Sequence, residues 1–380
     1  MTDAPRVAMV AGETSGDLLA GLLLDGLKAR WPGLTSFGIG GARMAEQGFD
    51  AWWESERLAV HGYSAELLVR LAGIVRIRQQ LRARLLRHRP DVFVGVDAPD
   101  FNLGLEAKLR ATGIKTVHFV CPSIWAWRPE RVEKIRAAAD HVLCLFPFEP
   151  ELLARHDIAA TFVGHPLASV IPLAPDRDGA RARLGLAPDD QVLAVLPGSR
   201  RAEVAYLASV FFQAVALVQK ARRAIKILVP AVPALRERIE AAARDAGVSG
   251  RVHIVTGRSH EVLAACDVTL IASGTATLEA ALFKRPMVIA YRMHPWSWRL
   301  MRRKRLQPWV GLPNVLSRDF IVPELLQDAA TPRALADAVL TWFDAPEAVQ
   351  QVQRRFTVLH ESLRRDTSTL AADAVAQLLA

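Results

Sequence analysis

Cysteine is scarce in this sequence, with three residues among 380. Cys121, Cys144 and Cys266 are odd in number and form no C-x-x-C pair, which excludes a disulfide framework and argues against a zinc site. We therefore expect a reducing compartment. Long apolar runs are also missing: no stretch of about 18 uncharged apolar residues occurs, so we expect no membrane-spanning helix. The first residues lack the pattern of a secretory signal peptide.

Acidic residues are outnumbered, 39 against 48 lysines and arginines, which leaves a formal net charge of +9. This balance favours an anionic partner: nucleic acid, anionic lipid or a phosphorylated substrate. Hydrophobic residues make up 51% of the chain, which excludes a disordered protein and supplies large cores. At this length we expect about two domains.

Short apolar runs alternate with longer amphipathic stretches, a pattern that predicts an α/β fold with parallel sheets covered by helices on both faces. The expected strands are Val7–Ala11, Val92–Val96, Thr116–Val120, Val142–Leu145, Phe162–Val163, Val192–Leu196, Ile225–Val229, Val252–Val255, Val268–Ile271 and Met287–Tyr291. Expected helices include Gly16–Arg30, Glu203–Arg223 and Leu235–Ala246.

The two halves of the chain begin alike, each with a strand, a glycine-containing loop and a helix. We therefore predict two Rossmann-like, doubly wound domains that face each other across a cleft, one at 1–168 and one at 169–345. The proline-rich stretch 166–188 is the expected hinge. We expect the amphipathic C-terminal segment, 346–380, to be helical and to pack back on the first domain.

Two loops of the first half follow expected strands, where the ligands of such sheets bind. The loop 12–17 combines glycines with Glu13, Ser15 and Asp17, and its carboxylates suit sugar hydroxyls better than phosphate. It would equally form a capped tight turn. The loop 97–102 offers Asp97 as a base for an attacking hydroxyl. It is also rich in turn-forming residues.

A third loop, 122–128, places two tryptophans beside an arginine after another expected strand. They suit stacking on a sugar or anchoring an acyl chain, and they would also fit core packing. Besides Asp97, the candidate site residues of these three loops are Glu13, Ser15, Gly16, Asp17, Asp100, Asn102, Ser123 and Trp125.

The second half carries loops suited to an anion. Gly198, Ser199 and Arg200 combine free backbone N–H groups at a helix start with a fixed positive charge, which suits a leaving diphosphate. The segment 273–279 offers small hydroxyl residues for phosphate oxygens and Glu279 for ribose hydroxyls. Solvated arginines in a turn and an ordinary helix cap remain the alternatives. The candidates in the second segment are Ser273, Gly274, Thr275, Thr277 and Glu279.

The stretch 67–89 interleaves leucines with arginines and contains no acidic residue. A basic, leucine-rich helix suits an anionic membrane surface, although an ordinary surface helix would share the pattern. The residues expected at the membrane are Leu67, Leu68, Leu71, Ile74, Val75, Arg76, Arg78 and Arg82. A second basic cluster with tryptophans, 292–305, suits an interface or a phosphorylated lipid, or a solvated face.

Metal binding is not indicated. The triplet Asp176-Arg177-Asp178 lies in the expected hinge rather than after a strand, so arginines and helix dipoles are expected to stabilise a leaving nucleotide. We expect no nucleic-acid partner, because the basic residues accompany leucine and tryptophan and no nucleic-acid module appears. A homo-oligomeric state stays open.

Eight blocks across nearly the whole chain, in the family's order, resemble the lipid-A-disaccharide synthase family. The blocks are AGETSGD (Ala11–Asp17), GIGGARM (Gly38–Met44), VGVDAPDFN (Val94–Asn102), PSIWAWR (Pro122–Arg128), GHPL (Gly164–Leu167), LPGSR (Leu196–Arg200), SGTATLE (Ser273–Glu279) and GLPNVL (Gly311–Leu316). The resemblance implies a GT-B glycosyltransferase without metal or other cofactor.

The implied reaction joins UDP-2,3-diacylglucosamine to 2,3-diacylglucosamine 1-phosphate, with inversion, to give a β-1,6-linked disaccharide phosphate and UDP. The implied location is the cytoplasmic face of the inner membrane of a Gram-negative bacterium. The resemblance makes Asp97 the general base. It places Arg200, Glu279 and Asn314 in the sugar-nucleotide site, and it places Glu13, Ser15 and Asp17 with the other candidates of the first half near the acceptor cleft. A different enzyme that acts on a UDP-sugar, such as another transferase or an epimerase, stays open. Two departures stand out: Ala65 occupies the position of a family glutamate, and Ser169 that of a common aspartate.

Overall fold

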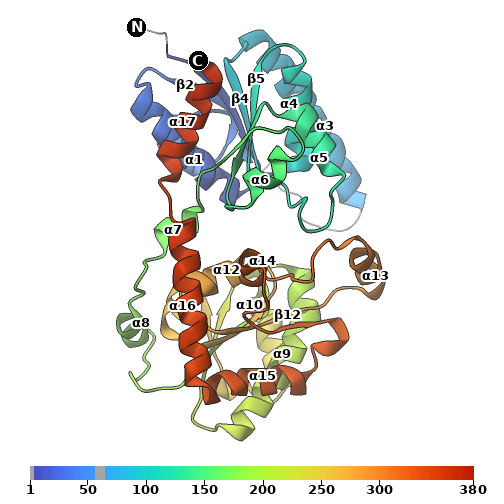
Figure 1. The fold of residues 1–380 in the computed structure, drawn as a ribbon. Coiled ribbons are helices and arrows are strands. Elements are labelled where there is room, and N and C mark those ends of the chain that lie inside the picture. Colours follow the sequence, from blue (N-terminus) through green and yellow to red (C-terminus); the bar gives the residue numbers. More distant parts are fainter. Residues whose placement is uncertain (1–3, 56–64) are drawn as a thin grey trace. The chain divides into compact units, whose positions relative to one another are not determined.

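A computed structural model describes residues 4–55 and 65–380, without the side chains of Thr14 and residues 65–72. Most of the segment His61–Glu66, where the sequence departs from the family motif, lies outside this description. The chain folds as two compact units (Figure 1). Unit 1 comprises 1–166 and 363–380, and unit 2 comprises 167–362.

Unit 1 contains a seven-stranded parallel sheet in the order β3-β2-β1-β4-β5-β6-β7. The strands are β1 (Arg6–Ala11), β2 (Thr35–Gly40), β3 (Asp50–Glu54), β4 (Val92–Val96), β5 (Lys115–Phe119), β6 (His141–Cys144) and β7 (Ala160–Phe162). Strands such as β4 are buried on both faces, which explains their unbroken runs of apolar residues.

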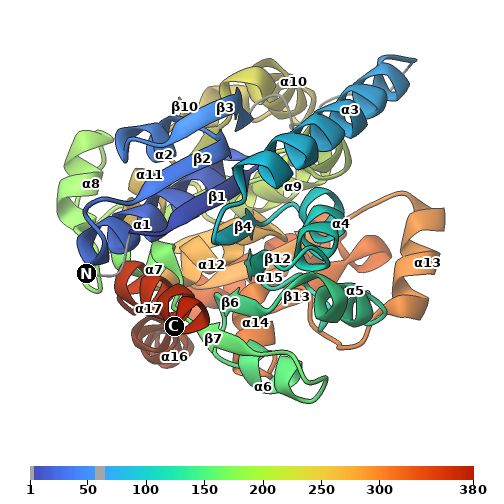
Figure 2. The same cartoon turned by 90° about the horizontal axis from the view of Figure 1, so that it is seen from above.

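Helices cover both faces of this sheet (Figure 2). They are α1 (Thr14–Arg30), α2 (Ala42–Glu46), α3 (Ala65–His88), α4 (Pro99–Arg110), α5 (Arg131–Ala138), α6 (Glu149–Ala154) and α17 (Thr367–Leu379). On one face α1 and α17 pack together, with Leu23 and Val375 in a shared core. On the other face Leu81 and Leu85 of α3 pack with Leu105 of α4.

Unit 2 contains a six-stranded parallel sheet in the order β10-β9-β8-β11-β12-β13. The strands are β8 (Val192–Leu196), β9 (Lys226–Ala231), β10 (His253–Thr256), β11 (Val268–Ala272), β12 (Met287–Tyr291) and β13 (Glu324–Leu326). The α-helices from the unit boundary onward are α7 (Pro166–Val170), α8 (Arg177–Arg183), α9 (Arg201–Ala221), α10 (Arg236–Asp245), α11 (Ser259–Ala265), α12 (Thr275–Leu282), α13 (Pro295–Lys304), α14 (Leu312–Ser317), α15 (Pro332–Asp344) and α16 (Pro346–Leu363).

The expected α/β class with two doubly wound parallel sheets is confirmed. Each expected strand is present, with ends shifted by at most a few residues. Three strands escaped prediction: β2, β3 and β13. Glycines interrupt the apolar pattern of β2, and β3 and β13 lie at sheet edges where burial is incomplete, so none shows a long apolar run.

The expected hinge is largely folded. Asp176 accepts a hydrogen bond from the Gly179 N–H and caps α8, so the D-x-D triplet begins a helix. Arg181, whose residue is 1% exposed, pairs with Asp267 and donates to loop carbonyls. The segment from Asp176 onward therefore packs within unit 2. Its proline and charge content suggested a linker because composition does not reveal a buried arginine with satisfied donors.

The C-terminal segment is divided between the units. Residues 346–362, most of α16, belong to unit 2, whereas α17 belongs to unit 1 and pairs Arg30 with Asp373 at 2.8 Å. We expected one segment from 346 onward and a boundary at 168/169, and the compact units divide at 166/167 and 362/363. Among the described residues, α9 alone is long and apolar enough to span a membrane, and much of it is buried in the unit 2 core.

Candidate functional site

Each sheet reverses its strand order at one point. In unit 1 the reversal lies between β1 and β4, and in unit 2 it lies between β8 and β11. The crevice beyond the carboxyl ends of such a strand pair is where doubly wound sheets bind ligands. The loops that follow these four strands are those predicted from sequence to carry the site. The topology therefore gathers these candidates into two groups, one per unit.

The loop after β1 leads directly into α1. Glu13 and Ser15 are exposed at its tip, while Gly16 is buried. A Cβ at Gly16 would lie 3.6 Å from the main-chain oxygen of Val96, at the end of β4. The small residue thus lets the start of α1 approach the neighbouring strand, which brings Glu13 and Ser15 to the same sheet edge as Asp97.

Asp17 plays a different part from the predicted one. It is 4% exposed, and its carboxylate accepts hydrogen bonds from the N–H groups of Gly41 and Arg43 at 2.8 Å and of Met44 at 3.2 Å. These groups open α2, where a carboxylate is favourable. Asp17 therefore holds the GIGGARM block against α1. Because its carboxylate already accepts these three hydrogen bonds, the geometry does not support a ligand contact by Asp17.

Asp97 follows β4 and begins a short left-handed segment. Asp97 and Ala98 have φ angles of 52° and 42°, and the Asp97 N–H donates to the Phe119 oxygen at 2.8 Å. Its residue is partly buried, and its carboxylate has no hydrogen bond or ion pair with any part of the chain that the structure describes. A partly exposed, unpaired carboxylate at this edge is available to accept a proton.

The two other polar residues of this loop differ in exposure. The Asp100 side chain is 86% exposed and pairs with Arg131 at 2.7 Å. Asn102 is fully buried, and its amide donates to the Asp97 oxygen at 2.9 Å and to the Val96 oxygen at 3.3 Å. Asn102 therefore holds the loop that carries Asp97 instead of lining an open site, contrary to the prediction.

A buried acid–base pair lies beneath this loop. Glu106 and His118 are fully buried and joined at 2.8 Å, and burial raises the pKa of Glu106. A Cβ at Gly95 would lie 2.0 Å from the Glu106 carboxylate, so no side chain fits there. This close contact explains the glycine two residues before Asp97. The sequence offered no sign of the pair, because α4 and β5 meet only in the fold.

The loop after β5 presents Ser123 exposed and Trp125 half-buried. Trp125 meets Phe148 edge-on at 5.5 Å, and its indole N–H donates to the Glu149 carboxylate at 3.1 Å. Phe146 and His165 extend this aromatic cluster. Burial raises the pKa of Glu149 to about 8 and lowers the pKa of His165 to about 4. Glu149 and the phenylalanines were missed because they follow β6, which ends in an ordinary turn.

In unit 2 the loop after β8 carries Arg200, whose side chain is 81% exposed. Gly198 has a φ of 126°, and a Cβ there would lie 2.4 Å from that of Glu203. Glu203 accepts from the N–H groups of Ser199 (2.9 Å) and Arg200 (3.2 Å). These two donors were predicted to be free for a diphosphate, and that was wrong. Glu203 lies at the third position of α9, where a glutamate commonly caps the helix start, so the sequence could have predicted these hydrogen bonds.

The loop after β11 is more open. Gly274 and Thr275 are exposed, and a Cβ at Gly274 would meet nothing within 4 Å. Thr277 is buried with its hydroxyl on the Gly274 oxygen, and Ser273 donates to the Val310 oxygen at 3.2 Å. No side chain caps the start of α12. The exposed loop and helix start therefore provide the freer backbone surface for an anion in unit 2.

Glu279, one turn into α12, pairs with His260 of α11 at 3.2 Å. The hydrogen bond that the imidazole donates to this carboxylate raises the pKa of His260. Both side chains are partly exposed. His260 was not predicted, because its partner comes from a separate helix. The ion pair occupies one carboxylate oxygen of Glu279, so the other oxygen is available to accept a hydrogen bond from a ligand hydroxyl.

Asn314 is placed differently from the prediction. It is fully buried: its amide donates to Val322 and Glu324, and its oxygen accepts from Ile321 and Val322. Glu324 in turn accepts from the Gly311 and Val310 N–H groups at 2.9 Å. Asn314 thus ties the start of α14 to β13. All of its hydrogen-bonding groups have partners within the fold, so we no longer expect Asn314 to contact a nucleotide directly.

The predicted membrane helix is α3. Leu67, Leu68 and Leu71 lie outside the described side chains. Of the five described residues, Val75 is 43% exposed and Arg76 is exposed. The half-buried ones are Ile74, Arg78 and Arg82.

The second basic cluster forms α13. Trp296 is 72% exposed and Leu300 59% exposed on this helix, whose last turn carries three basic residues. No part of α13 is buried. It projects as an amphipathic, basic helix from unit 2 (Figure 1).

Comparison with known proteins gives one family. The sequence profile described as lipid-A-disaccharide synthetase matches residues 7–377. The lipid-A-disaccharide synthase of Verminephrobacter eiseniae is 66% identical, with 99% of this chain and 97% of the relative covered. That of Albidiferax ferrireducens is 67% identical, with coverage of 98% and 97%.

Solved structures share the fold at low identity. A glycosyltransferase from Rickettsia africae is 10% identical with a TM-score of 0.60, and the alignment covers 99% of this chain and 98% of that one. A UDP-GlcNAc 2-epimerase from Neisseria meningitidis bound to UDP-GlcNAc is 11% identical with a TM-score of 0.64, and the coverage is 98% and 99%. At these identities the likeness shows the two-domain architecture alone.

Proposed function

This chain belongs to the lipid-A-disaccharide synthase family, and we propose that it joins UDP-2,3-diacylglucosamine to 2,3-diacylglucosamine 1-phosphate. The proposed products are the β-1,6-linked disaccharide phosphate and UDP, with inversion at the anomeric carbon. We place the acceptor on unit 1 and the sugar nucleotide on unit 2. The observation that carries this division is the contrast in charge between the two strand-reversal loops.

Carboxylates gather at the reversal point of unit 1, where Glu13 is exposed and Asp97 is unpaired among the described residues. Such groups suit hydroxyls and repel phosphate. At the reversal point of unit 2, the loop after β8 carries the exposed Arg200 guanidinium, and the loop after the neighbouring strand β11 leads into an uncapped helix start at Gly274. Those groups suit a diphosphate. Acceptor and donor are thus assigned by electrostatics.

Asp97 acts as the general base in this mechanism. The acceptor 6-oxygen bonds to the anomeric carbon as the bond from that carbon to the diphosphate oxygen breaks. The hydroxyl proton passes to the Asp97 carboxylate, and the electron pair leaves with UDP. Asp97 and Ala98 both have left-handed backbone conformations, which non-glycine residues seldom adopt and which cluster at active sites. General-base assistance of this kind contributes about 10²–10⁴-fold.

Charge on the departing diphosphate is stabilised by Arg200 and by the start of α12. The start of α9 contributes less than the sequence suggested, because Glu203 occupies two of its N–H groups. Glu203 also pairs with Arg200 at 3.3 Å, so a diphosphate would replace a carboxylate at the guanidinium. We propose that no metal takes part, and activity retained in excess chelator tests this point.

We also propose that the enzyme works as a peripheral protein at the cytoplasmic face of the inner membrane. The support is the basic, partly apolar surface of α3 and the exposed Trp296 and Leu300 of α13. Diacylated sugars are membrane lipids, so a soluble enzyme must dock to reach them. Clusters of arginine beside apolar side chains favour an anionic surface.

Product analysis by mass spectrometry tests the reaction. Incubation with UDP-2,3-diacylglucosamine and the monosaccharide 1-phosphate should give the disaccharide phosphate and one UDP per linkage. Omission of the acceptor lipid should abolish UDP release. Turnover of the sugar nucleotide without acceptor would instead identify an epimerase or hydrolase and end the proposal.

A further inference from the structure

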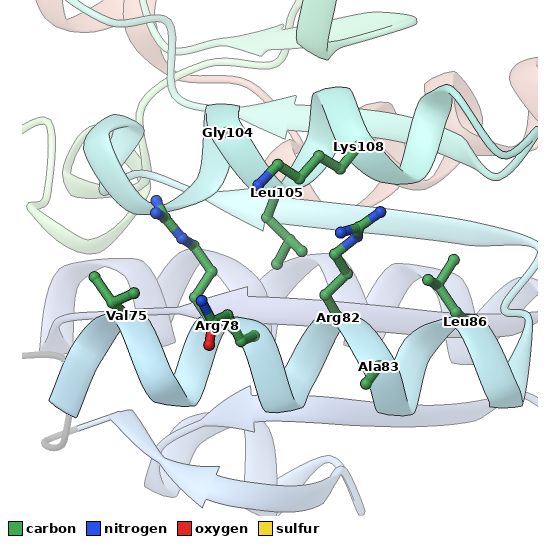
Figure 3. Close-up of a pocket in the computed structure, with 9 residues that line it drawn as sticks. Val75, Arg78, Arg82, Ala83, Leu86, Gly104, Leu105 and Lys108 are labelled. Atoms are coloured by element: carbon green, nitrogen blue, oxygen red, sulfur yellow. The ribbon is translucent and has the colours of Figure 1, made fainter. Parts of the chain in front are cut away.

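A pocket of about 310 Å³ lies between α3 and α4 of unit 1 (Figure 3). Val75 and Leu86 of α3 and Leu105 of α4 supply its apolar wall. Arg78 and Arg82 extend from α3, and Lys108 extends from α4 (Figure 3). Two helices from different parts of the sequence thus bring three positive charges to one hollow.

No acidic residue is among the described residues that line the pocket. Arg78, Arg82 and Lys108 form no ion pair with any described residue, whereas all three arginines of α4 and α5 are paired, as Arg110 is with Asp140 at 2.7 Å. The Arg82 Nε is buried and has no hydrogen-bond partner in the described part of the chain. A buried charged donor normally has a partner, so its absence marks a place for an acceptor from outside the chain.

Gly104 provides room for such an acceptor. It lies on the α4 face of the pocket, and a Cβ there would be 3.7 Å from an Arg78 guanidinium nitrogen. A longer side chain at this position would project into the space where the guanidinium lies. Glycine in mid-helix lowers helix stability relative to alanine, and the absence of a side chain at Gly104 keeps this wall of the pocket open.

The pocket is separate from the strand-reversal site. Lys108 lies nine residues after Pro99, which corresponds to about 14 Å along the α4 axis from the end that follows Asp97. An acceptor whose 6-hydroxyl contacts Asp97 is not expected to reach Lys108 with its own phosphate. The charge of the pocket therefore calls for a different ligand.

We propose that this pocket binds the headgroup phosphate of an anionic bilayer phospholipid. The proposal rests on, and sharpens, the peripheral membrane docking put forward above. Two guanidinium groups and an ammonium suit the oxygens of one phosphate, since arginine binds them through paired N–H donors. Val75, 43% exposed at the pocket, offers an apolar contact for the glycerol or the first acyl carbons.

Vesicle sedimentation with matched variants tests the pocket. The probe is phosphatidylcholine vesicles with and without phosphatidylglycerol. Arg78→Gln/Arg82→Gln removes two charges from the pocket, whereas Arg76→Gln/Arg87→Gln removes two exposed charges from the same helix. Diffuse attraction alone is worth up to about 30-fold for two charges in either variant, so the pocket variant should lose at least about tenfold more affinity for phosphatidylglycerol vesicles than the surface variant. Equal losses of vesicle affinity in the two variants would show that α3 attracts the membrane only through diffuse charge, and would overturn the proposed headgroup site.

Lys108→Gln supplies an independent test, because Lys108 belongs to α4 and not to the membrane helix predicted from sequence. It should weaken vesicle binding as much as either pocket arginine alone, and binding equal to wild type would contradict the proposal. Circular dichroism checks the fold of each variant.

Two further outcomes separate the possible failures. A raised KM for the sugar phosphate acceptor in detergent micelles, with vesicle binding unchanged, would put the acceptor phosphate in the pocket and overturn a bilayer lipid there. Absence of vesicle binding by the wild-type protein would overturn the pocket and the docking together, while glycosyl transfer in micelles would still stand.

Discussion

The side-chain amide of Asn102 donates a hydrogen bond to the main-chain oxygen of Asp97 at 2.9 Å. The same amide reaches the Val96 oxygen at 3.3 Å, so one buried side chain ties the end of β4 to the first turn of α4. The tie holds Asp97 and Ala98 in left-handed conformations that a non-glycine residue seldom adopts. Asn102 is therefore a positioning residue for the proposed base.

Asn102→Ala should lower kcat about 10- to 100-fold while KM for the sugar nucleotide changes little. The loss follows because the Asp97 loop relaxes toward ordinary φ angles and the carboxylate leaves its place. Steady-state kinetics measures it. A buried carbonyl left without its donor should also cost about 1–3 kcal/mol of unfolding free energy. Loss of stability with unchanged kcat would make Asn102 structural only.

Asp97→Ala should remove most turnover, about 10²–10⁴-fold in kcat, while UDP affinity stays near that of wild type. The carboxylate is unpaired among the described residues, so its removal should leave the fold intact. Single-turnover kinetics and calorimetric titration with UDP measure the two effects. Asp189→Ala is the control, since that exposed aspartate lies in unit 2 and its side chain forms no hydrogen bond or ion pair with any described residue. Wild-type rates in Asp97→Ala would end the assignment of the base.

Arg200→Ala should weaken UDP binding about 10- to 100-fold and slow transfer. A charge-assisted hydrogen bond to a phosphate is worth about 1.5–3 kcal/mol, and the exposed guanidinium contributes little to the fold. Isothermal titration gives the affinity. Arg223→Ala, which removes an exposed charge just beyond the other end of α9, serves as control. Unchanged UDP affinity in Arg200→Ala would argue for a different diphosphate site.

Glu149→Gln should flatten the pH dependence of stability. Burial raises the pKa of Glu149 from 4.5 to about 8, so the folded protein keeps a proton that the unfolded chain releases near pH 4.5. Folding therefore becomes less favourable as the pH rises from about 4.5 to about 8, by a few kcal/mol at most. Denaturant unfolding across this range measures the slope.

The glutamine variant loses this slope, although its amide satisfies only one of the two donors at the site, Trp125 and the Phe146 N–H. The unfolding free energy of Glu149→Gln should therefore be lower than that of the wild type at pH 5, and the difference between the two should become smaller by pH 8. Glu151→Gln on the same helix, where the carboxylate is 69% exposed, should retain the wild-type slope. If the unfolding free energies of both variants differed from that of the wild type by the same amount at every pH, the prediction would be contradicted.

Glu279→Gln should lower the pKa of His260 toward 6.5, because the hydrogen bond that the imidazole donates to the carboxylate is the main cause of its elevation. In the wild-type protein the pKa of His260 is higher in the folded state than in the unfolded chain, where it is 6.5. The protonated imidazole therefore stabilises the fold below pH 6.5, and this stabilisation is lost as the pH rises through the pKa of the folded state. NMR titration of the imidazole follows the change. UDP binding should weaken as well, and a normal affinity would remove Glu279 from the proposed ribose site.

Sequence by itself determined the α/β class and ten of the thirteen strands. It could do so because buried parallel strands leave uninterrupted apolar runs. The eight blocks also identified the family that the comparisons show. The loops after the strands are marked by glycine, hydroxyl and charged residues, and their part in the chemistry stays a prediction.

Only the tertiary structure decided which polar side chains face outward. Asp17, Asn102 and Asn314 look like site residues in the sequence, yet each is buried and serves backbone groups of another segment. The Arg82 and Lys108 pocket likewise exists only because α3 and α4 pack together. Hydrogen bonds and charge clusters between distant segments depend on how elements meet in space, and the order of residues along the chain does not record that geometry.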